Sequence, residues 1–89
     1  MISWHQEALD DLSAIIDYIS DDNPAAAQLL KDEILAKINN LLRFPYIYKP
    51  GRVEGTREMV VTTNYIVVYT ENNGTITILR VLHTARLWP

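Results

Sequence analysis

The chain has 89 residues, of which 48% are hydrophobic, and a formal net charge of −3. This length predicts one small domain that spans residues 1–89. The absence of cysteine excludes disulfides, thiolate metal sites and cysteine nucleophiles. No apolar run approaches the roughly 20 residues of a membrane span, and no basic region leads into an apolar one at the N-terminus. We therefore expect no signal peptide, no membrane partner and a cytoplasmic location.

The charge is unevenly distributed along the chain. Residues 1–48 carry three basic and eight acidic side chains, whereas residues 49–89 carry five basic and three acidic ones, so the net charges are −5 and +2. An acidic chain argues against broad, non-specific DNA binding, which requires a basic domain. The basic second half is still compatible with a nucleic acid or an acidic protein as partner. We interpret the eight acids of the first half as a solvated helix face.

The first half predicts a short strand and two helices. Residues 2–4 fit a strand, and apolar side chains then recur at helical spacing from about His5 to Ser20. Asn23 suits the cap of a second helix and Pro24 its first position. This helix is expected to end near Arg43, and the tight connection between the helices predicts a helical hairpin.

The second half predicts a loop and three strands. Residues 46–55 read as the loop, and strands are expected over residues 57–63, 65–71 and 75–82. Asn72-Asn73-Gly74 is a strong signal for a tight hairpin turn, because Asn and Gly tolerate positive φ. The order β-α-α-β-β-β predicts an α+β domain in which the N-terminal helical hairpin packs on a small antiparallel sheet.

The last strand has no cleanly polar face. Strict alternation places Ile76, Ile78, Arg80 and Leu82 on one side, and the other side holds Leu79 and Val81 among polar residues. Two interpretations remain open. Arg80 interrupts an apolar face and needs a carboxylate partner, or both faces are partly covered, the outer one by a partner protein.

Most catalytic signatures are absent from the chain. It has no phosphate-binding loop, no Gly-x-Ser-x-Gly turn and no paired-histidine metal spacing, so we expect no metal site and no cofactor. The remaining candidates are polar and aromatic side chains of the second half. They are Arg57, Tyr65, Tyr69, Arg80, His83, Arg86 and Trp88.

These candidates include what RNA cleavage by a 2′-hydroxyl would require. His83 has an unperturbed pKa near neutrality and could act as base or acid. Arg57, Arg80 and Arg86 could hold the phosphate, and Trp88 or a tyrosine could stack a base.

Each candidate also has a purely structural interpretation. The arginines could pair with neighbouring acids, for which Glu58 and Glu71 are available. Tyr65 and Tyr69 share a strand face and could simply pack, and a lone histidine without an orienting acid is a weak catalytic signal. Trp88 could serve only to dock the tail.

Several motifs together make the chain resemble the ParE/RelE toxin superfamily over nearly its whole length. They include Ala-x-x-Asp-Leu at residues 8–12, the helix start at residues 23–27, and Phe44-Pro45. Further matches are Gly-Thr-Arg-Glu at residues 55–58, Tyr-Ile-Val-Val-Tyr at residues 65–69, and the segments at residues 78–83 and 85–89. The resemblance implies the same β-α-α-β-β-β fold and a bacterial type II toxin that arrests growth until an antitoxin neutralises it.

The resemblance leaves two targets open, because ParE-like members poison DNA gyrase whereas RelE-like members cleave mRNA on the ribosome. Arg80 and His83 fit positions of the nuclease type, which would make Arg57, Arg80, His83 and Arg86 catalytic. Ile66 and Val68, however, lie where that type places an arginine, and the tail has no tyrosine. The overall pattern is more similar to ParE, so we favour gyrase. A non-toxic interaction module is a third alternative.

The expected partner in every toxin interpretation is a cognate antitoxin. A sheet with apolar residues on both faces favours a partner that covers it by helix packing or strand addition. We expect an acidic, disordered segment that folds on the toxin in a hetero-oligomer. Its contacts, or those of the target, are expected at Arg57, Tyr65, Tyr69, Arg80, Arg86 and Trp88.

Overall fold

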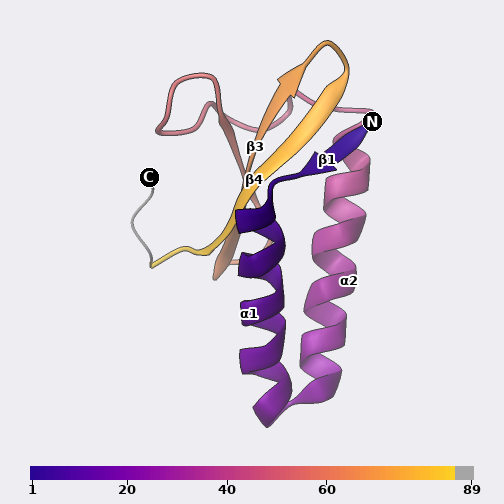
Figure 1. The fold of residues 1–89 in the computed structure, drawn as a ribbon, viewed down its shortest axis with the longest axis vertical. Coiled ribbons are helices and arrows are strands. Elements are labelled where there is room, and N and C mark those ends of the chain that lie inside the picture. Colours follow the sequence, from indigo (N-terminus) through magenta and orange to yellow (C-terminus); the bar gives the residue numbers. More distant parts are fainter. Residues whose placement is uncertain (86–89) are drawn as a thin grey trace.

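The computed structural model describes residues 1–85 and places two helices against one face of a four-stranded sheet (Figure 1). The elements follow the expected β-α-α-β-β-β order. Their bounds are β1 Ile2–Trp4, α1 Gln6–Asp22, α2 Pro24–Asn40, β2 Arg57–Val60, β3 Tyr65–Asn72 and β4 Thr75–His83. The fold class predicted from the sequence is therefore confirmed.

The sheet has the strand order β1-β4-β3-β2. β4 pairs antiparallel with β3, which pairs antiparallel with β2. β1 runs parallel to β4, with Ile2 opposite Ile76 and Trp4 opposite Ile78, and this one parallel pair makes the sheet mixed. Because β1 has only three residues, it flanks only the first part of β4.

The helical hairpin forms where the sequence signals predict it. Asn23 is the N-cap of α2, and its side-chain oxygen accepts a hydrogen bond of 3.1 Å from the backbone N–H of Ala26. Pro24 occupies the first turn, where its missing N–H costs nothing. The helix ends at Asn40, three residues before the expected end, and the chain continues in turns.

The main core lies between the hairpin and the sheet. Ile34 and Ile38 of α2 and Ala8 of α1 are buried against strand residues. From the sheet come Met59, Val61, Val67, Tyr69, Ile76, Ile78 and Val81. The larger aliphatic side chains among them each contribute on the order of 1.5–3 kcal/mol to the free energy of folding when they are fully buried.

A bulge in β4 changes the faces that strict alternation predicts. Tyr69 lies opposite Ile78 and Val68 lies opposite Arg80, so Leu79 is an extra residue between them. From that point Val81, and not Arg80, packs in the main core. The prediction that Arg80 shares the face of Ile76 and Ile78 is therefore wrong, because a regular period of two cannot anticipate a bulge.

The outer face of the sheet carries its own apolar cluster. Ile66, Val68 and Leu82 are buried there, with Leu79 packed beside them. Val68 is 0% exposed without any partner present. The apolar residues of this face therefore do not by themselves require a partner protein, contrary to one of the two interpretations of the sequence.

The β3–β4 turn adopts the expected conformation. Asn73 has a φ of 51° and Gly74 a φ of 82°, which is the left-handed region that this tight turn needs. The Glu71 carboxylate accepts a hydrogen bond of 2.9 Å from the Gly74 N–H and holds the turn closed.

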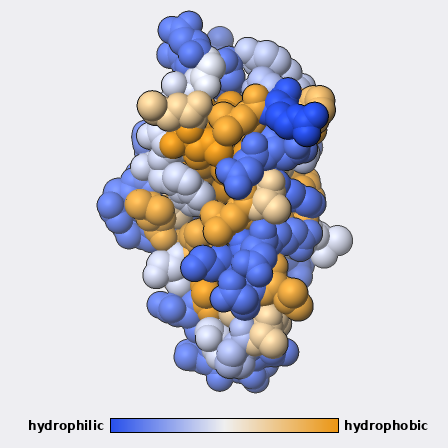
Figure 2. Space-filling model, turned by 90° about the vertical axis from the view of Figure 1, so that its right-hand side faces the viewer, coloured by the Kyte–Doolittle hydropathy of each residue, from blue (hydrophilic) through white to orange (hydrophobic). Residues whose placement is uncertain are grey.

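The surface on the α2 side mixes apolar and charged side chains without one continuous apolar field (Figure 2). Among residues 1–85, neither helix has the length and apolar character needed to cross a membrane.

Candidate functional site: a groove and a loop at opposite ends of the sheet

A groove lies where β1 ends and α1 crosses the last part of β4. β1 pairs only with residues 76–78, so residues 79–83 face α1 instead of a neighbouring strand. Two adjoining hollows of about 300 and 220 Å³ follow this line. Their lining comes from α1 and the ends of β3 and β4, namely Asp10, Asp11, Ala14, Ile15, Tyr18, Tyr65, Val81 and His83. We call this feature the α1/β4 groove.

Asp11 joins α1 to the exposed edge of β4. Its carboxylate accepts hydrogen bonds of 2.7 Å from Arg80 Nε and 3.0 Å from Arg80 Nη2, and a third of 3.0 Å from the Val81 N–H. Glu7 lies 3.5 Å from Arg80 Nη1 and adds a second carboxylate. The hydrogen bonds to Asp11 raise the pKa of the Arg80 guanidinium further. Asp11 therefore occupies the Val81 N–H, an edge group that an added strand would use.

These contacts answer the question that the sequence left open for Arg80. The side chain of Arg80 is only 24% exposed and that of Asp11 only 11%. Arg80 is thus a member of a structural ion pair that fixes α1 on the sheet. Asp11 is also an exception to the solvated acidic face that we predicted for the first half.

His83 is exposed at the far end of β4 and contacts Tyr65 edge to face, with ring centroids 5.3 Å apart. The Ala85 N–H donates a hydrogen bond of 3.0 Å to His83 Nδ1. Since Nδ1 accepts, the proton of the neutral ring lies on Nε2. His83 therefore presents a donor beside the groove. Among the described residues no group of three or more His, Asp or Glu side chains is arranged to hold a metal ion.

Tyr69 lies on the same strand face as Tyr65 but deeper in the molecule. It is 0% exposed, and its hydroxyl donates a hydrogen bond of 2.8 Å to the carbonyl of Pro45. Burial raises the pKa of this hydroxyl. Tyr69 is a core residue that anchors the loop after α2, and its side chain is not on a binding surface.

Arg57 lies on β2, which forms the opposite edge of the sheet from β1 and β4. Its Nη1 donates a hydrogen bond of 2.6 Å to the carbonyl of Tyr48, and its guanidinium lies 5.1 Å from the ring centroid of Tyr46. β3 separates β2 from β4, so Arg57 does not join Arg80 and His83 in one site.

The described candidates therefore fall into two groups. Tyr65 and His83 line the α1/β4 groove, and Arg80 bonds to Asp11 of its lining. Arg57, on β2, bonds instead to the loop between α2 and β2. Arg86 and Trp88 lie outside the described residues. Neither Glu58 nor Glu71 forms the expected ion pair with Arg57 or Arg80. A carboxylate oxygen of Glu58 lies 3.9 Å from Arg52 Nε. The carboxylate of Glu71 accepts a hydrogen bond of 2.6 Å from the Tyr46 hydroxyl.

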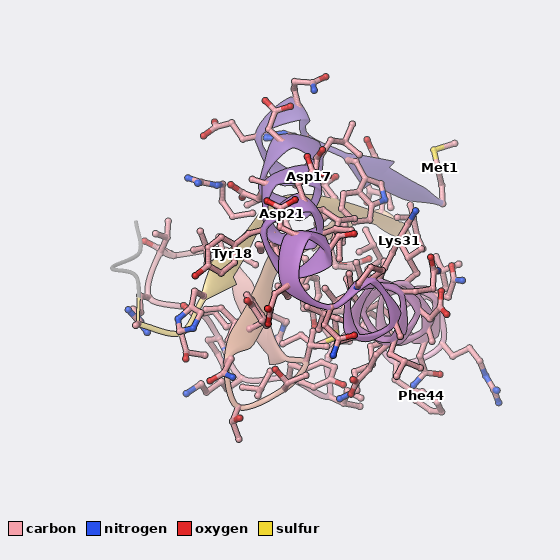
Figure 3. All side chains as sticks on the ribbon, turned by 90° about the horizontal axis from the view of Figure 1, so that it is seen from below. Met1, Asp17, Tyr18, Asp21, Lys31 and Phe44 are labelled. Atoms are coloured by element: carbon pink, nitrogen blue, oxygen red, sulfur yellow. The ribbon has the colours of Figure 1, made fainter. Side chains whose placement is uncertain are left out.

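Two surface features were missed by the sequence analysis. Tyr18 is 80% exposed and borders the groove, and the loop after α2 exposes Phe44, Tyr46 and Ile47. Seen along the hairpin, Tyr18 and Phe44 lie on opposite sides of the molecule (Figure 3). The signal for the loop was present as aromatic residues next to arginines, in a stretch that was treated only as a connection.

The comparisons with known proteins agree with this architecture. The family model of the ParE toxin of the type II toxin–antitoxin system parDE matches residues 2–88. The chain is 35% identical to Toxin RelE2 of Caulobacter vibrioides over 88 residues, which cover 97% of each chain.

Solved structures share the fold at lower identity. A chain of the chromosomal ParDE system from P. aeruginosa has a TM-score of 0.80 at 22% identity, with 92% of each chain covered. A chain of the E. coli DinJ-YafQ toxin-antitoxin complex has a TM-score of 0.71 at 14% identity, with 100% of this chain and 97% of that one covered. Since the family model spans nearly the whole chain, this protein belongs to the ParE toxin family of type II toxin–antitoxin systems, within the ParE/RelE superfamily.

Proposed function

We propose that the chain is a ParE-like toxin that inhibits DNA gyrase and needs no nuclease site of its own. The observation that carries this proposal is the separation of the two candidate arginines within residues 1–85, Arg57 and Arg80. Arg80 is held between Asp11 and Glu7, and Arg57 is bonded to a loop carbonyl two strands away. A phosphate undergoing transfer needs cations and a proton donor around one point.

The antitoxin is proposed to occupy the α1/β4 groove. The groove combines apolar walls with an edge of β4 that, among residues 1–85, has no flanking strand beyond Ile78. A chain that folds on binding can insert apolar side chains there and pair with edge groups of β4 other than the Val81 N–H, which already bonds to Asp11. Tyr18 and Tyr65 offer large, rigid side chains of the kind that dominates binding energy. An intracellular target would place the toxin in the cytoplasm.

The direct test uses toxin purified from its antitoxin complex. We expect it to inhibit supercoiling by gyrase and to leave ribosome-bound mRNA intact. Addition of the antitoxin encoded beside it should restore supercoiling. Cleaved mRNA with normal supercoiling would contradict the gyrase proposal, and no effect in either assay would favour a non-toxic interaction module.

A RelE-like ribosome-dependent nuclease is the second candidate, and the exposure of His83 favours it. In the observed arrangement the exposed Nε2–H of His83 can donate a hydrogen bond to a phosphate oxygen. Proton transfer to a leaving oxygen would require the imidazolium, in which Nδ1 is itself protonated and no longer accepts from Ala85. His83→Gln removes proton transfer while it keeps a similar size. A nuclease would then lose about 10²–10⁴-fold in cleavage rate. We expect instead that His83→Gln inhibits gyrase as strongly as the wild type.

A further inference from the structure

The loop after α2 carries an unusual group of exposed side chains. Leu42 is 48% exposed, Phe44 45%, Tyr46 61% and Ile47 59%. The guanidinium of Arg43 lies 5.4 Å from the Phe44 ring centroid, and that of Arg57 lies 5.1 Å from the Tyr46 ring centroid. We call these six residues the arginine–aromatic surface. Two cation–aromatic contacts within so short a segment exceed the usual frequency of about one per 70–80 residues.

Three hydrogen bonds hold this surface in place, two at its backbone and one at a side chain. Tyr69 donates to the Pro45 carbonyl at 2.8 Å, and Arg57 donates to the Tyr48 carbonyl at 2.6 Å. The Tyr46 hydroxyl donates to Glu71 at 2.6 Å. A surface that is already ordered loses less conformational entropy on binding. The loop therefore presents apolar and aromatic groups in a preorganised arrangement. A loop that only links two elements of secondary structure does not need such ordering.

The surface is also distinct in charge. Residues 42–58, which include Glu58 because it lies 3.9 Å from Arg52, carry four cations and two carboxylates, a net charge of +2. Residues 6–40 carry two cations and eight carboxylates, a net charge of −6. The partner that fits is therefore acidic. The exposed aliphatic side chains of Leu42 and Ile47 favour a protein over a nucleic acid.

The surface is separate from the α1/β4 groove. Tyr65 at the start of β3 lies at the groove, and Glu71 near the end of the same strand bonds to the loop. Six residues of extended strand span about 20 Å, and Arg57 and Arg80, which lie opposite neighbouring residues of β3, are separated across that strand by two strand spacings of about 4.8 Å each. The loop runs at the top of the ribbon in Figure 1, and α1 crosses β4 below it. One partner can thus occupy the groove while a second contacts the loop.

We infer that the arginine–aromatic surface is the contact site for the toxin's protein target, through an acidic region of that target that also presents apolar side chains. This inference rests on the proposed function, in which the target is gyrase and the antitoxin occupies the groove. Arg43 and Arg57 supply positive charge, and Phe44 and Ile47 supply the apolar contact.

The test compares loop variants with matched variants on α2. Ile47→Ser and Arg43→Glu should each raise the toxin concentration for half-inhibition of supercoiling about tenfold, as is typical of residues central to an interface. The controls are Leu29→Ser, at a residue of α2 that is 70% exposed, and Lys31→Glu, at an exposed residue on the side of α2 that faces α1. We expect the controls to inhibit within about twofold of the wild type, and all four variants to keep their melting temperature and antitoxin affinity.

The outcomes separate the two proposals. Loop variants that inhibit gyrase as well as the controls would overturn this inference and leave the proposed function standing. A wild type that fails to inhibit gyrase would overturn both. Loss of antitoxin affinity in the loop variants would assign the surface to the antitoxin instead. Weakened binding of a single-stranded RNA oligonucleotide in Arg43→Glu, with gyrase inhibition unchanged, would assign it to nucleic acid.

Discussion

The two sides of β3 use the same residue type in different ways, since Arg80 of β4 lies opposite Val68 and Arg57 of β2 lies opposite Tyr69. On the β4 side Arg80 lies 2.7 Å from the carboxylate of Asp11 and 3.5 Å from that of Glu7, so its charge is neutralised inside the molecule. On the β2 side Arg57 donates to a neutral carbonyl and lies over the ring of Tyr46, so its positive charge is kept. The difference shows that an arginine on a strand keeps its charge available for a partner only when its own contacts are with neutral groups.

Removal of Asp11 should have the largest effect on stability. Asp11→Ala leaves Arg80 without its main partner and the Val81 N–H without an acceptor. We expect the free energy of unfolding to fall by about 3 kcal/mol, as for broken, largely buried ion pairs. Urea unfolding measures it. Asp10→Ala, at an exposed neighbour, should stay within about 0.5 kcal/mol of the wild type. Equal effects of the two variants would refute the assignment of Arg80 to a structural ion pair.

Tyr69→Phe should have the second largest effect on stability, because Tyr69 anchors the loop after α2. It removes the hydrogen bond to Pro45 and leaves that carbonyl half-buried without its donor. We expect a loss of about 1 kcal/mol in unfolding free energy. Tyr18→Phe is the matched control, since Tyr18 is 80% exposed and should show no measurable change. A silent Tyr69→Phe would mean that the loop is not anchored through this bond.

The smallest effect concerns the pH dependence of the loop anchor. The hydrogen bond from Tyr46 lowers the pKa of Glu71 below its usual value. A carboxyl with a lowered folded pKa stabilises the protein above its unfolded pKa, and this stabilisation is lost as the pH falls through the folded pKa. The stability difference between the wild type and Glu71→Gln should therefore be present at pH 7 and shrink below about pH 4. Unfolding curves of both proteins at pH 7 and pH 3 measure it, and a difference independent of pH would exclude this contribution.

Much of the fold followed from local signals. Asn23 and Pro24 mark the start of α2, and Asn73 and Gly74 mark the β3–β4 turn, because these residues act through their own backbone and side chains. The bulge at Leu79 was not predictable, since it depends on how β4 meets both β3 and α1. The parallel pairing of β1 with β4 likewise depends on contacts between distant segments.

The candidate site was predicted less completely than the fold. The sequence identified Arg80 and stated that it would need a carboxylate if it lay in an apolar environment, but Asp11 lies 69 positions earlier and could not be selected among eight acids. The loop after α2 was treated as a connection, because the bonds that order it come from Tyr69, Arg57 and Glu71 on other elements. Tertiary contacts, and not local propensity, define both the α1/β4 groove and the loop after α2.

We propose that the α1/β4 groove and the arginine–aromatic surface are separate binding surfaces, and that the antitoxin occupies the groove. Hydrogen–deuterium exchange of the toxin, alone and in complex with its antitoxin, tests it most directly. We expect the complex to slow exchange in residues 79–83 and along α1, and to leave residues 43–48 unchanged. Protection of residues 43–48 without protection of the end of β4 would contradict the account.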